Sequence, residues 1–311
     1  MRLAVVDVGS NSTRLLVADV APDGRLTELE RRTTITRLAE GVDHTRVLAD
    51  AAVDRTLRAL EDYAQRIAGH DVDATAAVLT SAVRDARNGT AFAAAVRARF
   101  GLDARIITGE EEARLTFLGA TSERPADGRR LLVVDIGGGS TELVTGTAGP
   151  GGGVDFHVST QAGVVRQTER FLRADPPRPA ELQRLAAEAA TIFAGAVPAH
   201  IRASVDAGIA VAGTPTSCAA MLQELDPYDP SRVHGFRLGR AECEALFTRL
   251  AAMTEGRRRE VVGLHPDRAP AIVAGMLLLL EAMRAFGLEE VEVSEHDILR
   301  GAALDLAAAS A

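Results

Sequence analysis

One pattern of residues occurs twice in this chain of 311 residues and limits the folds that the chain can adopt. Residues 3–17 read LAVVDVGSNSTRLLV, and residues 131–145 read LLVVDIGGGSTELVT. Each copy combines an apolar strand, an aspartate, a loop rich in glycine or serine, and a second apolar strand. Such a loop can bind phosphate through its backbone N–H groups. The repetition therefore predicts an α/β protein with two related half-domains that face one phosphate-bearing ligand.

The two copies differ at one charged position. Asp7 aligns with Asp135, but Arg14 of the first copy corresponds to Glu142 of the second. This difference predicts a division of labour, in which the first copy mainly binds an anion and the second also binds a metal.

Composition excludes several classes of function. The net charge of −8 argues against general nucleic-acid binding. All 35 basic residues are arginine, so the lysine of a P-loop is absent. The longest apolar stretch, residues 269–283, contains Pro270 and Glu281 and is too short to cross a membrane. Two cysteines and an N-terminus that enters a strand directly, without a signal peptide, predict a cytoplasmic protein.

Strands and helices alternate along the chain, with a hairpin at the start of each half. The polar segment 122–130, which contains Pro125 and Gly128, is predicted to separate a domain of residues 1–121 from one of residues 122–296. The main elements expected are strands at 3–8, 14–20, 27–38, 74–80, 104–107, 208–212 and 291–293, helices at 49–68, 90–100, 109–119, 181–196, 240–253, 255–262, 269–286 and 297–309, and a turn at 150–153.

The second loop is the stronger candidate for phosphate binding. Its three consecutive glycines cost conformational entropy on folding, so an ordinary turn explains them poorly. Gly138, Gly139 and Ser140 are predicted to bind phosphate. Asp135 and Glu142 lie on the two flanking strands, and carboxylates of this kind hold Mg²⁺ while the ion shares phosphate oxygens. The sequence therefore predicts a metal site beside this loop.

The first loop offers more side-chain donors. Ser10, Asn11 and Ser12 are predicted to add their polar groups to the backbone amides in binding phosphate. Asp7 occupies the position of the aspartate in the second copy and is predicted among the metal ligands. An ordinary hairpin turn is the alternative explanation for this loop.

Two further side chains are candidates for the chemistry. Arg84 follows a buried strand and can fork onto phosphate oxygens, with a surface ion pair to Asp85 or a glutamate as the alternative. Glu112 is the last of three acids at the head of a helix, where acids complement the helix dipole. Glu112 and Arg114 can instead face the active site, where a carboxylate would orient and deprotonate a water. Residue types alone do not choose between these alternatives.

Two later segments are weaker candidates. Residues 213–217 form a glycine–threonine loop before a helix, where an anion can bind, although simple helix capping explains them as well. Glu295 and His296 precede the last helix and can face the active site. Capping of that helix by Ser294 or Asp297 is the alternative.

Five blocks together resemble one protein family. They are DVGSNS at 7–12, TSAVR at 80–84, ITGEEEARL at 107–115, DIGGGSTE at 135–142 and VSEHDILRG at 293–301. In this order, and over nearly the whole chain, they are similar to the exopolyphosphatase / guanosine pentaphosphate phosphohydrolase family within the superfamily of actin, Hsp70 and sugar kinases. The block with three glutamates separates this family from sugar kinases and chaperones.

The resemblance implies an α/β fold of two actin-like (ribonuclease H-like) domains related by duplication, with the active site in the cleft between them. It also implies that residues 297–311 pack on the first domain. Glu112 matches the catalytic base of the family, and Arg84 matches a phosphate-binding arginine. Asp135 and Glu142 match the magnesium-associated acids. The positions that fall in the two phosphate loops are Ser10, Asn11, Gly138 and Ser140.

The predicted activity is the release of terminal phosphate from inorganic polyphosphate, with water activated by Glu112 and with Mg²⁺ or Mn²⁺ as cofactor. An alternative substrate is pppGpp, which would yield ppGpp. A non-catalytic nucleotide-binding regulator and a small-molecule kinase are further alternatives. The sequence does not rank polyphosphate against pppGpp. It predicts no nucleic-acid or membrane partner and leaves the oligomeric state open, with a homodimer among the alternatives.

Overall fold

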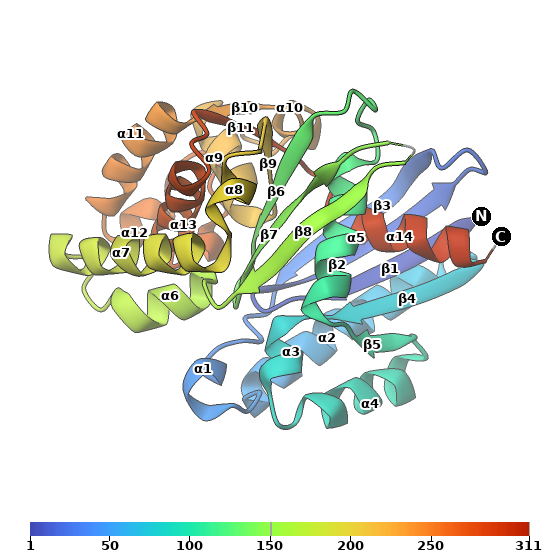
Figure 1. Cartoon of the computed structure of the whole chain (residues 1–311). Helices are drawn as coiled ribbons and strands as arrows, with labels where there is room; N and C mark the ends of the chain where they lie inside the picture. The colour runs from blue at the N-terminus through green and yellow to red at the C-terminus, as the bar shows by residue number, and fades with distance from the viewer. Residues whose placement is uncertain (150, 311) are drawn as a thin grey trace. The chain divides into compact units, whose positions relative to one another are not determined.

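The computed structural model describes residues 1–149 and 151–310. Pro150, at the start of the turn predicted for residues 150–153, lies outside the described residues. The chain forms two compact units, of which unit 1 comprises Met1–Gly119 with Asp297–Ala311 and unit 2 comprises Ala120–His296. Figure 1 shows both units, each built around its own sheet.

Unit 1 is built on a five-stranded sheet with the order β3-β2-β1-β4-β5. The first three strands form an antiparallel meander, whereas β4 runs parallel to β1 and β5 parallel to β4. The antiparallel hairpin and the strands that follow it agree with the sequence prediction. The strands are β1 (Arg2–Val8), β2 (Ser12–Val20), β3 (Leu26–Ile35), β4 (Ala74–Leu79) and β5 (Ala104–Ile106).

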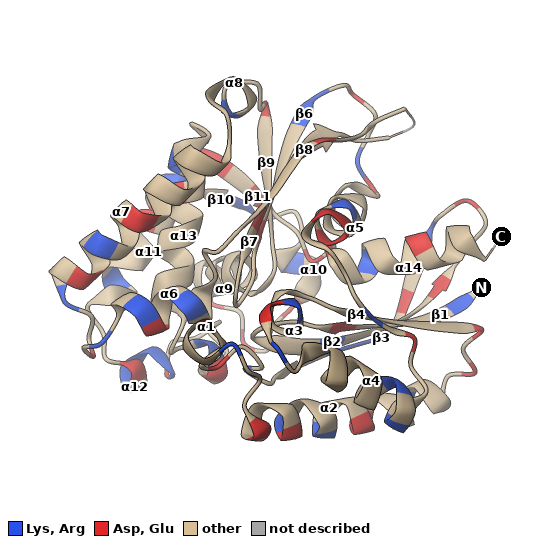
Figure 2. Cartoon of the chain, turned by 60° about the horizontal axis from the view of Figure 1, so that its bottom comes forward, with Lys and Arg blue, Asp and Glu red and all other residues tan. Residues whose placement is uncertain are grey.

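Helices cover both faces of this sheet because successive residues of a strand point to opposite sides. Val6 packs with Leu60 of a helix on one side, and Val5 packs with Leu115 and Leu299 of two helices on the other. Figure 2 shows α2 and α4 on one side of the sheet and α14 on the other. The helices are α1 (Val42–Thr45), α2 (Asp50–Ala68), α3 (Ser81–Asp85), α4 (Gly89–Phe100), α5 (Gly109–Thr121), whose last two residues belong to unit 2, and α14 (Ile298–Ala309).

The C-terminal segment packs on unit 1 because two glycines bring its helix against α5. A Cβ at Gly301 would lie 1.8 Å from the carbonyl oxygen of Leu115, and a Cβ at Gly119 would lie 1.9 Å from that of Asp297. No larger residue fits at either position without separating the two helices. The return of the chain to unit 1 after His296 therefore depends on this close backbone contact.

Unit 2 is built on a six-stranded sheet with the order β10-β11-β9-β6-β7-β8. Its antiparallel meander β6-β7-β8 is followed by β9 and β11, which run parallel to β6. This is the arrangement of unit 1 with one strand added at the edge, so the predicted duplication is confirmed. The strands are β6 (Arg130–Ile136), β7 (Thr141–Thr147), β8 (Gly153–Thr160), β9 (Ala207–Val211), β10 (Arg237–Gly239) and β11 (Glu290–Val293).

The most buried helix of unit 2 is the predicted apolar one, which the structure places at Ile272–Ala285 as α13. Among the described residues, no helix combines the length and the apolar character that crossing a bilayer requires. The other helices are α6 (Val164–Phe171), α7 (Pro179–Ala196), α8 (Ala199–Arg202), α9 (Gly213–Leu222), α10 (Pro230–Val233), α11 (Arg240–Ala251), α12 (Glu255–Arg258) and the 3₁₀ turn η1 (Pro266–Arg268).

Parts of unit 2 differ from the sequence prediction. The segment 213–217 is not a loop, because α9 begins at Gly213 and the turn from β9 is made by Ala212 alone, with φ of 71°. The helix predicted for 255–262 ends at Arg258. The sequence also provided no indication of α6, because the first turn of this helix buries two polar residues and therefore lacks the usual helical pattern of apolar side chains.

Candidate active site

The two repeated loops are closed by the same backbone contact. The N–H of Gly9 donates to the carbonyl of Ser12, and the N–H of Gly137 donates to that of Ser140, both at 3.0 Å. A Cβ at Gly9 would lie 2.9 Å from the Ser12 oxygen, which requires glycine at this turn. The two loops therefore share this closing hydrogen bond, and they differ in their side chains.

The second loop directs three successive amides to one side. The carbonyls of Gly137 and Gly138 accept N–H groups of Val164 and Val165 at the start of α6, and the carbonyl of Gly139 accepts Nε of Arg166 at 2.8 Å. In a trans peptide the N–H of the next residue points opposite to the carbonyl. The amides of residues 138–140 consequently point away from α6, as in a backbone anion site. This geometry supports the predicted phosphate contacts of Gly138, Gly139 and Ser140.

Arg166 is a residue that the sequence analysis missed. Its side chain is buried behind the second loop, and burial lowers the pKa of its guanidinium. The contact with Gly139 places this guanidinium where it holds the loop carbonyl and adds positive charge near the amides. The only signal in the sequence was an arginine among valines in the segment Gly163 to Gln167.

Asp135 and Glu142 are directly opposite each other on β6 and β7. Both are buried, with 8% and 1% of their surface exposed, and Glu142 Oε1 accepts the hydroxyl of Ser159 at 2.7 Å. Like charges opposite each other on neighbouring strands destabilise a sheet, and a bound cation would offset this repulsion. Carboxylate oxygens are the ligands that Mg²⁺ prefers. The donor set therefore fits the divalent ion predicted at this position.

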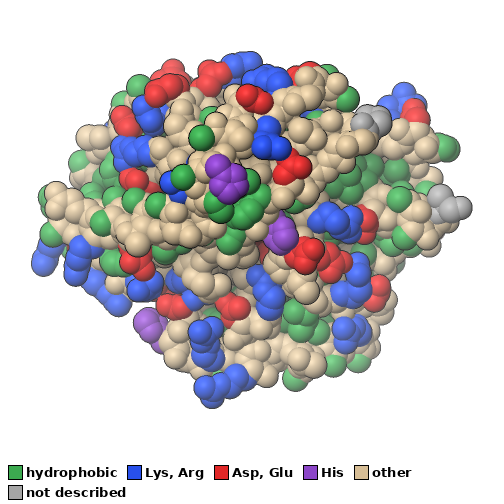
Figure 3. Space-filling view, viewed as in Figure 1, with side chains coloured by type: hydrophobic (Ala, Val, Ile, Leu, Met, Phe, Trp, Pro, Cys, Tyr) green, Lys and Arg blue, Asp and Glu red, His purple; other side chains and the backbone are tan. Residues whose placement is uncertain are grey.

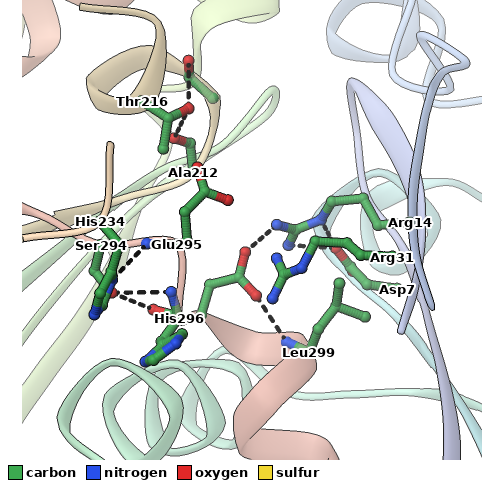
Figure 4. Close-up of polar contacts among 12 residues, drawn as sticks. Asp7, Arg14, Arg31, Ala212, Thr216, His234, Ser294, Glu295, His296 and Leu299 are labelled. Carbon is green, nitrogen blue, oxygen red and sulfur yellow. Dashed lines mark hydrogen bonds and ion pairs between the residues drawn. The ribbon is translucent and has the colours of Figure 1, made fainter. Parts of the chain in front are cut away.

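The corresponding pair in unit 1 is Asp7 and Arg14. Arg14 donates to Asp7 Oδ2 from Nε at 2.9 Å and from Nη2 at 2.7 Å, and also pairs with Asp297 (Figure 4). Burial raises the pKa of Asp7 against the opposing charge of Arg14. Asp7 Oδ1 is buried without a hydrogen-bond partner, and this oxygen remains a candidate for the metal role predicted for Asp7.

These contacts change the interpretation of Arg14. Its guanidinium holds two carboxylates of unit 1, one on the first loop's strand and one before α14. Burial opposes ionisation of Asp297, but the charges of Arg14 and Arg31 hold its pKa below the ordinary value. In the structure Arg14 therefore connects elements of unit 1, and the anion role suggested by comparing the two copies stays a prediction.

Hydrogen bonds hold the first loop to the rest of unit 1. Ser10 Oγ lies 2.8 Å from Ser81 Oγ, and both hydroxyls are buried. The carbonyl of Asn11 accepts the N–H groups of Thr36 and Arg37 at 3.0 and 2.9 Å. Ser12 begins β2. The loop is thus held by contacts to residue 81 and to residues 36 and 37, while its role in phosphate binding stays a prediction.

Arg84 and Glu112 meet in unit 1. Nη1 of Arg84 donates to Glu112 Oε2 at 2.9 Å and to the carbonyl of Ile107 at 3.0 Å. Glu112 is 7% exposed, whereas Glu110 is exposed and Glu111 half-buried in the same helical turn. An acid that only complements the helix dipole does not need to be buried, so its burial distinguishes Glu112 from the two glutamates before it. Arg84 forms an ion pair with a glutamate, as the alternative interpretation expected, and this glutamate is the candidate base.

Three other predicted positions, Arg114, Gly213 and Glu295, have polar partners. Arg114 pairs with Asp305 at 2.8 Å and thus joins α5 to α14. The carbonyl of Gly213, the first residue of α9, accepts a hydrogen bond from Nη1 of Arg268 at 2.8 Å. Glu295 accepts a hydrogen bond from Tyr228; burial and then this neighbouring charge raise the pKa of the tyrosine.

Comparison with known proteins places the chain in a family. The sequence profile of the Ppx/GppA phosphatase family matches residues 16–308. The chain belongs to the Ppx/GppA phosphatase family. It is 38% identical to exopolyphosphatase 2 of Mycobacterium tuberculosis, with 98% of each chain covered.

Solved structures agree with this Ppx/GppA assignment. A crystal structure of an exopolyphosphatase-like protein has a TM-score of 0.92 and 32% identity, with 100% of both chains covered. A Ppx/GppA family member from Aquifex aeolicus has a TM-score of 0.82 and 31% identity, covering 100% of this chain and 98% of that one. The predicted fold class, two actin-like domains related by duplication, is confirmed by these similarities.

Proposed function

We propose that this Ppx/GppA protein is an exopolyphosphatase that hydrolyses the terminal phosphoanhydride of inorganic polyphosphate. The observation that carries the proposal is the second loop, whose three amides point to one side next to the buried acids Asp135 and Glu142. The similarity to exopolyphosphatase 2 along 98% of the chain supports polyphosphate as the substrate. Basic and acidic side chains are interspersed over the face in Figure 3, so a polyanion would be held by local groups such as these amides.

The proposed reaction divides binding from proton transfer. The amides of residues 138–140 and the polar groups of Ser10 and Asn11 hold oxygens of the terminal phosphate. Asp135 and Glu142 would hold Mg²⁺ or Mn²⁺, which when bound neutralises phosphate oxygens. Stabilisation of this charge by prearranged groups is usually the largest contribution to phosphoryl transfer.

Glu112 is proposed to act as the general base. It orients a water molecule, accepts its proton, and the water oxygen forms a bond to the terminal phosphorus. The bond between that phosphorus and the bridging oxygen breaks, and the shortened polyphosphate leaves with the bridging oxygen and its electron pair. Arg84, which is paired with Glu112 at 2.9 Å, would turn part of its guanidinium to the incoming phosphate.

The test measures phosphate release from polyphosphates of defined length, pppGpp and ATP, each with Mg²⁺, with Mn²⁺ and with a chelator. Release from polyphosphate in preference to the nucleotides is expected. Preference for pppGpp would make the protein a pppGpp phosphohydrolase, and binding without release would favour a regulator. Transfer from ATP to an acceptor other than water would identify a kinase.

Glu112→Gln should lower the rate by about 10²–10⁴-fold, the usual contribution of a general base. Glu110→Gln removes an exposed acid from the same helical turn and is the matched control. Full phosphate release by Glu112→Gln would make the assignment of the base wrong.

A further inference from the structure

A cluster of two histidines and a glutamate lies in unit 2, separate from the acids on β6 and β7. Glu123, His234 and His296 each offer one ligand atom, and these three atoms lie within 4.8 Å of one another. We propose that this cluster binds a divalent transition-metal ion of the Zn²⁺ type. The proposal does not depend on the proposed function, because none of the three residues takes part in that chemistry.

The donor set decides the class of ion. Two imidazoles and one carboxylate are ligands typical of Zn²⁺ sites that keep a fourth position for water. Asp135 and Glu142, by contrast, offer oxygen alone, which suits Mg²⁺. The chain therefore contains two donor sets of different chemical character, and a nitrogen-preferring ion discriminates between them.

The side chains are already close to the required arrangement. The rings of His234 and His296 have centroids 4.1 Å apart and planes inclined by 34°. Nδ1 of His296 lies 3.9 Å from Glu123 Oε2. Zn²⁺ bound at about 2.0–2.1 Å in a tetrahedral site places its ligand atoms roughly 3.4 Å apart. Side-chain shifts of about 1 Å would close the cluster around an ion, with no change in backbone path.

Neighbouring contacts hold the two histidines in place. The hydroxyl of Ser294 accepts the N–H of His296 at 2.9 Å and donates to its carbonyl at 3.0 Å, which fixes the backbone of this residue (Figure 4). The N–H of Glu295 donates to Nδ1 of His234 at 3.2 Å. Nδ1 of His234 accepts this long hydrogen bond with its lone pair, and a cation would take the lone pair in exchange for the hydrogen bond.

The charged neighbours in sequence have partners of their own. Arg124, next to Glu123, pairs with Glu292 on β11, and the carboxylate of Glu295 accepts Tyr228. The candidate ligands of an ion in the cluster are the two rings and the carboxylate of Glu123.

The positions of the ligands indicate a structural role. Glu123 is the fourth residue of unit 2, and His296 is its last residue before the chain returns to unit 1. A bound ion would tie the segment that enters unit 2 to the segment that leaves it. We expect it to stabilise unit 2 against unfolding from these two ends, since an ion that binds only the folded state raises its stability.

The experiment titrates the metal-free full chain with Co²⁺, followed by absorption in the visible range, and with Zn²⁺, followed by calorimetry. Wild type should bind one nitrogen-ligated ion and show the strong visible band of four-coordinate Co²⁺, and Zn²⁺ should raise its melting temperature. His296→Gln and His234→Gln should each weaken Zn²⁺ binding by at least about 100-fold, because loss of a group that only supports a ligand already costs up to that amount. The band and the rise in melting temperature should disappear in both variants.

His157→Gln changes a histidine of the same intermediate burial outside the cluster and should bind as wild type does. Glu142→Gln should keep the Co²⁺ band, which separates this site from the acids beside the second loop. Circular dichroism and melting without metal establish that each variant is folded. Wild-type affinity in folded His234→Gln and His296→Gln, or the absence of micromolar Zn²⁺ binding by wild type, would overturn the proposal.

Discussion

Arg84 donates to the carboxylate of Glu112 at 2.9 Å, so the candidate phosphate ligand and the candidate base form an ion pair. The two residues lie on α3 and α5, the helices that follow the neighbouring parallel strands β4 and β5. Under the proposed function, an incoming phosphate would compete with Glu112 for the same guanidinium, because charge-assisted bonds to either anion are strong. This competition would link substrate binding to release of the carboxylate.

Replacing Arg84 should therefore impair catalysis more than stability. Arg84→Ala is expected to lower kcat/KM for polyphosphate about 10²–10³-fold, the usual effect of removing one donor to a developing charge. Arg84→Lys should recover only part of this loss, because lysine lacks the forked donors. Initial rates of phosphate release measure both effects. Arg87→Ala removes an exposed arginine three residues later and should be neutral; equal losses in the two alanine variants would contradict a specific role for Arg84.

Replacing Arg166 should affect both stability and substrate binding, because this side chain holds the second loop. In Arg166→Met the carbonyl of Gly139 loses a buried donor, which should cost about 1–3 kcal/mol of unfolding free energy. KM for polyphosphate should rise together with this loss, because the amide of Ser140, which shares a peptide plane with this carbonyl, loses its fixed direction. Urea unfolding and steady-state kinetics give the two quantities. Arg170→Met, one turn further along α6 and exposed, is the control. An unchanged KM in Arg166→Met would show that the loop is held without this residue.

The strands and long helices were predictable because their signals are local. The repeated Asp–loop–strand phrase recurs in the structure with the same backbone bond at Gly9 and Gly137. The helix over Arg166 and Gln167 was missed because both polar side chains are buried, so burial there does not follow apolar character. The turn at Ala212 was missed because a positive φ at a residue other than glycine has no reliable sequence signal.

The side-chain partners in the candidate site were less predictable than its residues. Arg14 pairs with Asp297, which lies 283 residues away, and no local pattern encodes such a contact. Arg84 and Glu112 were each singled out for phosphate chemistry, but their pairing depends on β4 and β5 being neighbours in the sheet. Residue types identified candidates, whereas the sheet order decided which of them meet.

The Arg14–Asp297 pair should make stability depend on pH in the acid range. The pKa of Asp297 is lower in the folded state than in the unfolded state. The ionised carboxylate therefore stabilises the folded protein above about pH 3.9, and this stabilisation is lost as the pH falls through the lower pKa of the folded state. Asp297→Asn is expected to destabilise the protein by roughly 3 kcal/mol at pH 7, because one partner of a buried ion pair is removed. The difference from wild type should shrink below pH 4.

Urea unfolding of wild type and Asp297→Asn between pH 3 and pH 7 measures this prediction. Asp305→Asn changes an acid of α14 whose ion pair with Arg114 is exposed, and it should cost at most about 1 kcal/mol. A constant difference between wild type and Asp297→Asn over the whole pH range would contradict the role of this ionisation.

The acids of unit 2 should determine the metal requirement of the reaction. Glu142 is 1% exposed and lies opposite Asp135, so Glu142→Gln leaves a single carboxylate at the predicted ion site. We expect the Mg²⁺ concentration for half-maximal phosphate release to rise at least about 10-fold, with partial recovery of the rate at high Mg²⁺. Glu169→Gln on α6 tests for a general effect of removing a negative charge from unit 2 and should leave the Mg²⁺ dependence unchanged. The same half-maximal Mg²⁺ concentration in Glu142→Gln and wild type would place the catalytic ion on other residues, with Asp7 Oδ1 as the next candidate because it is buried without a partner.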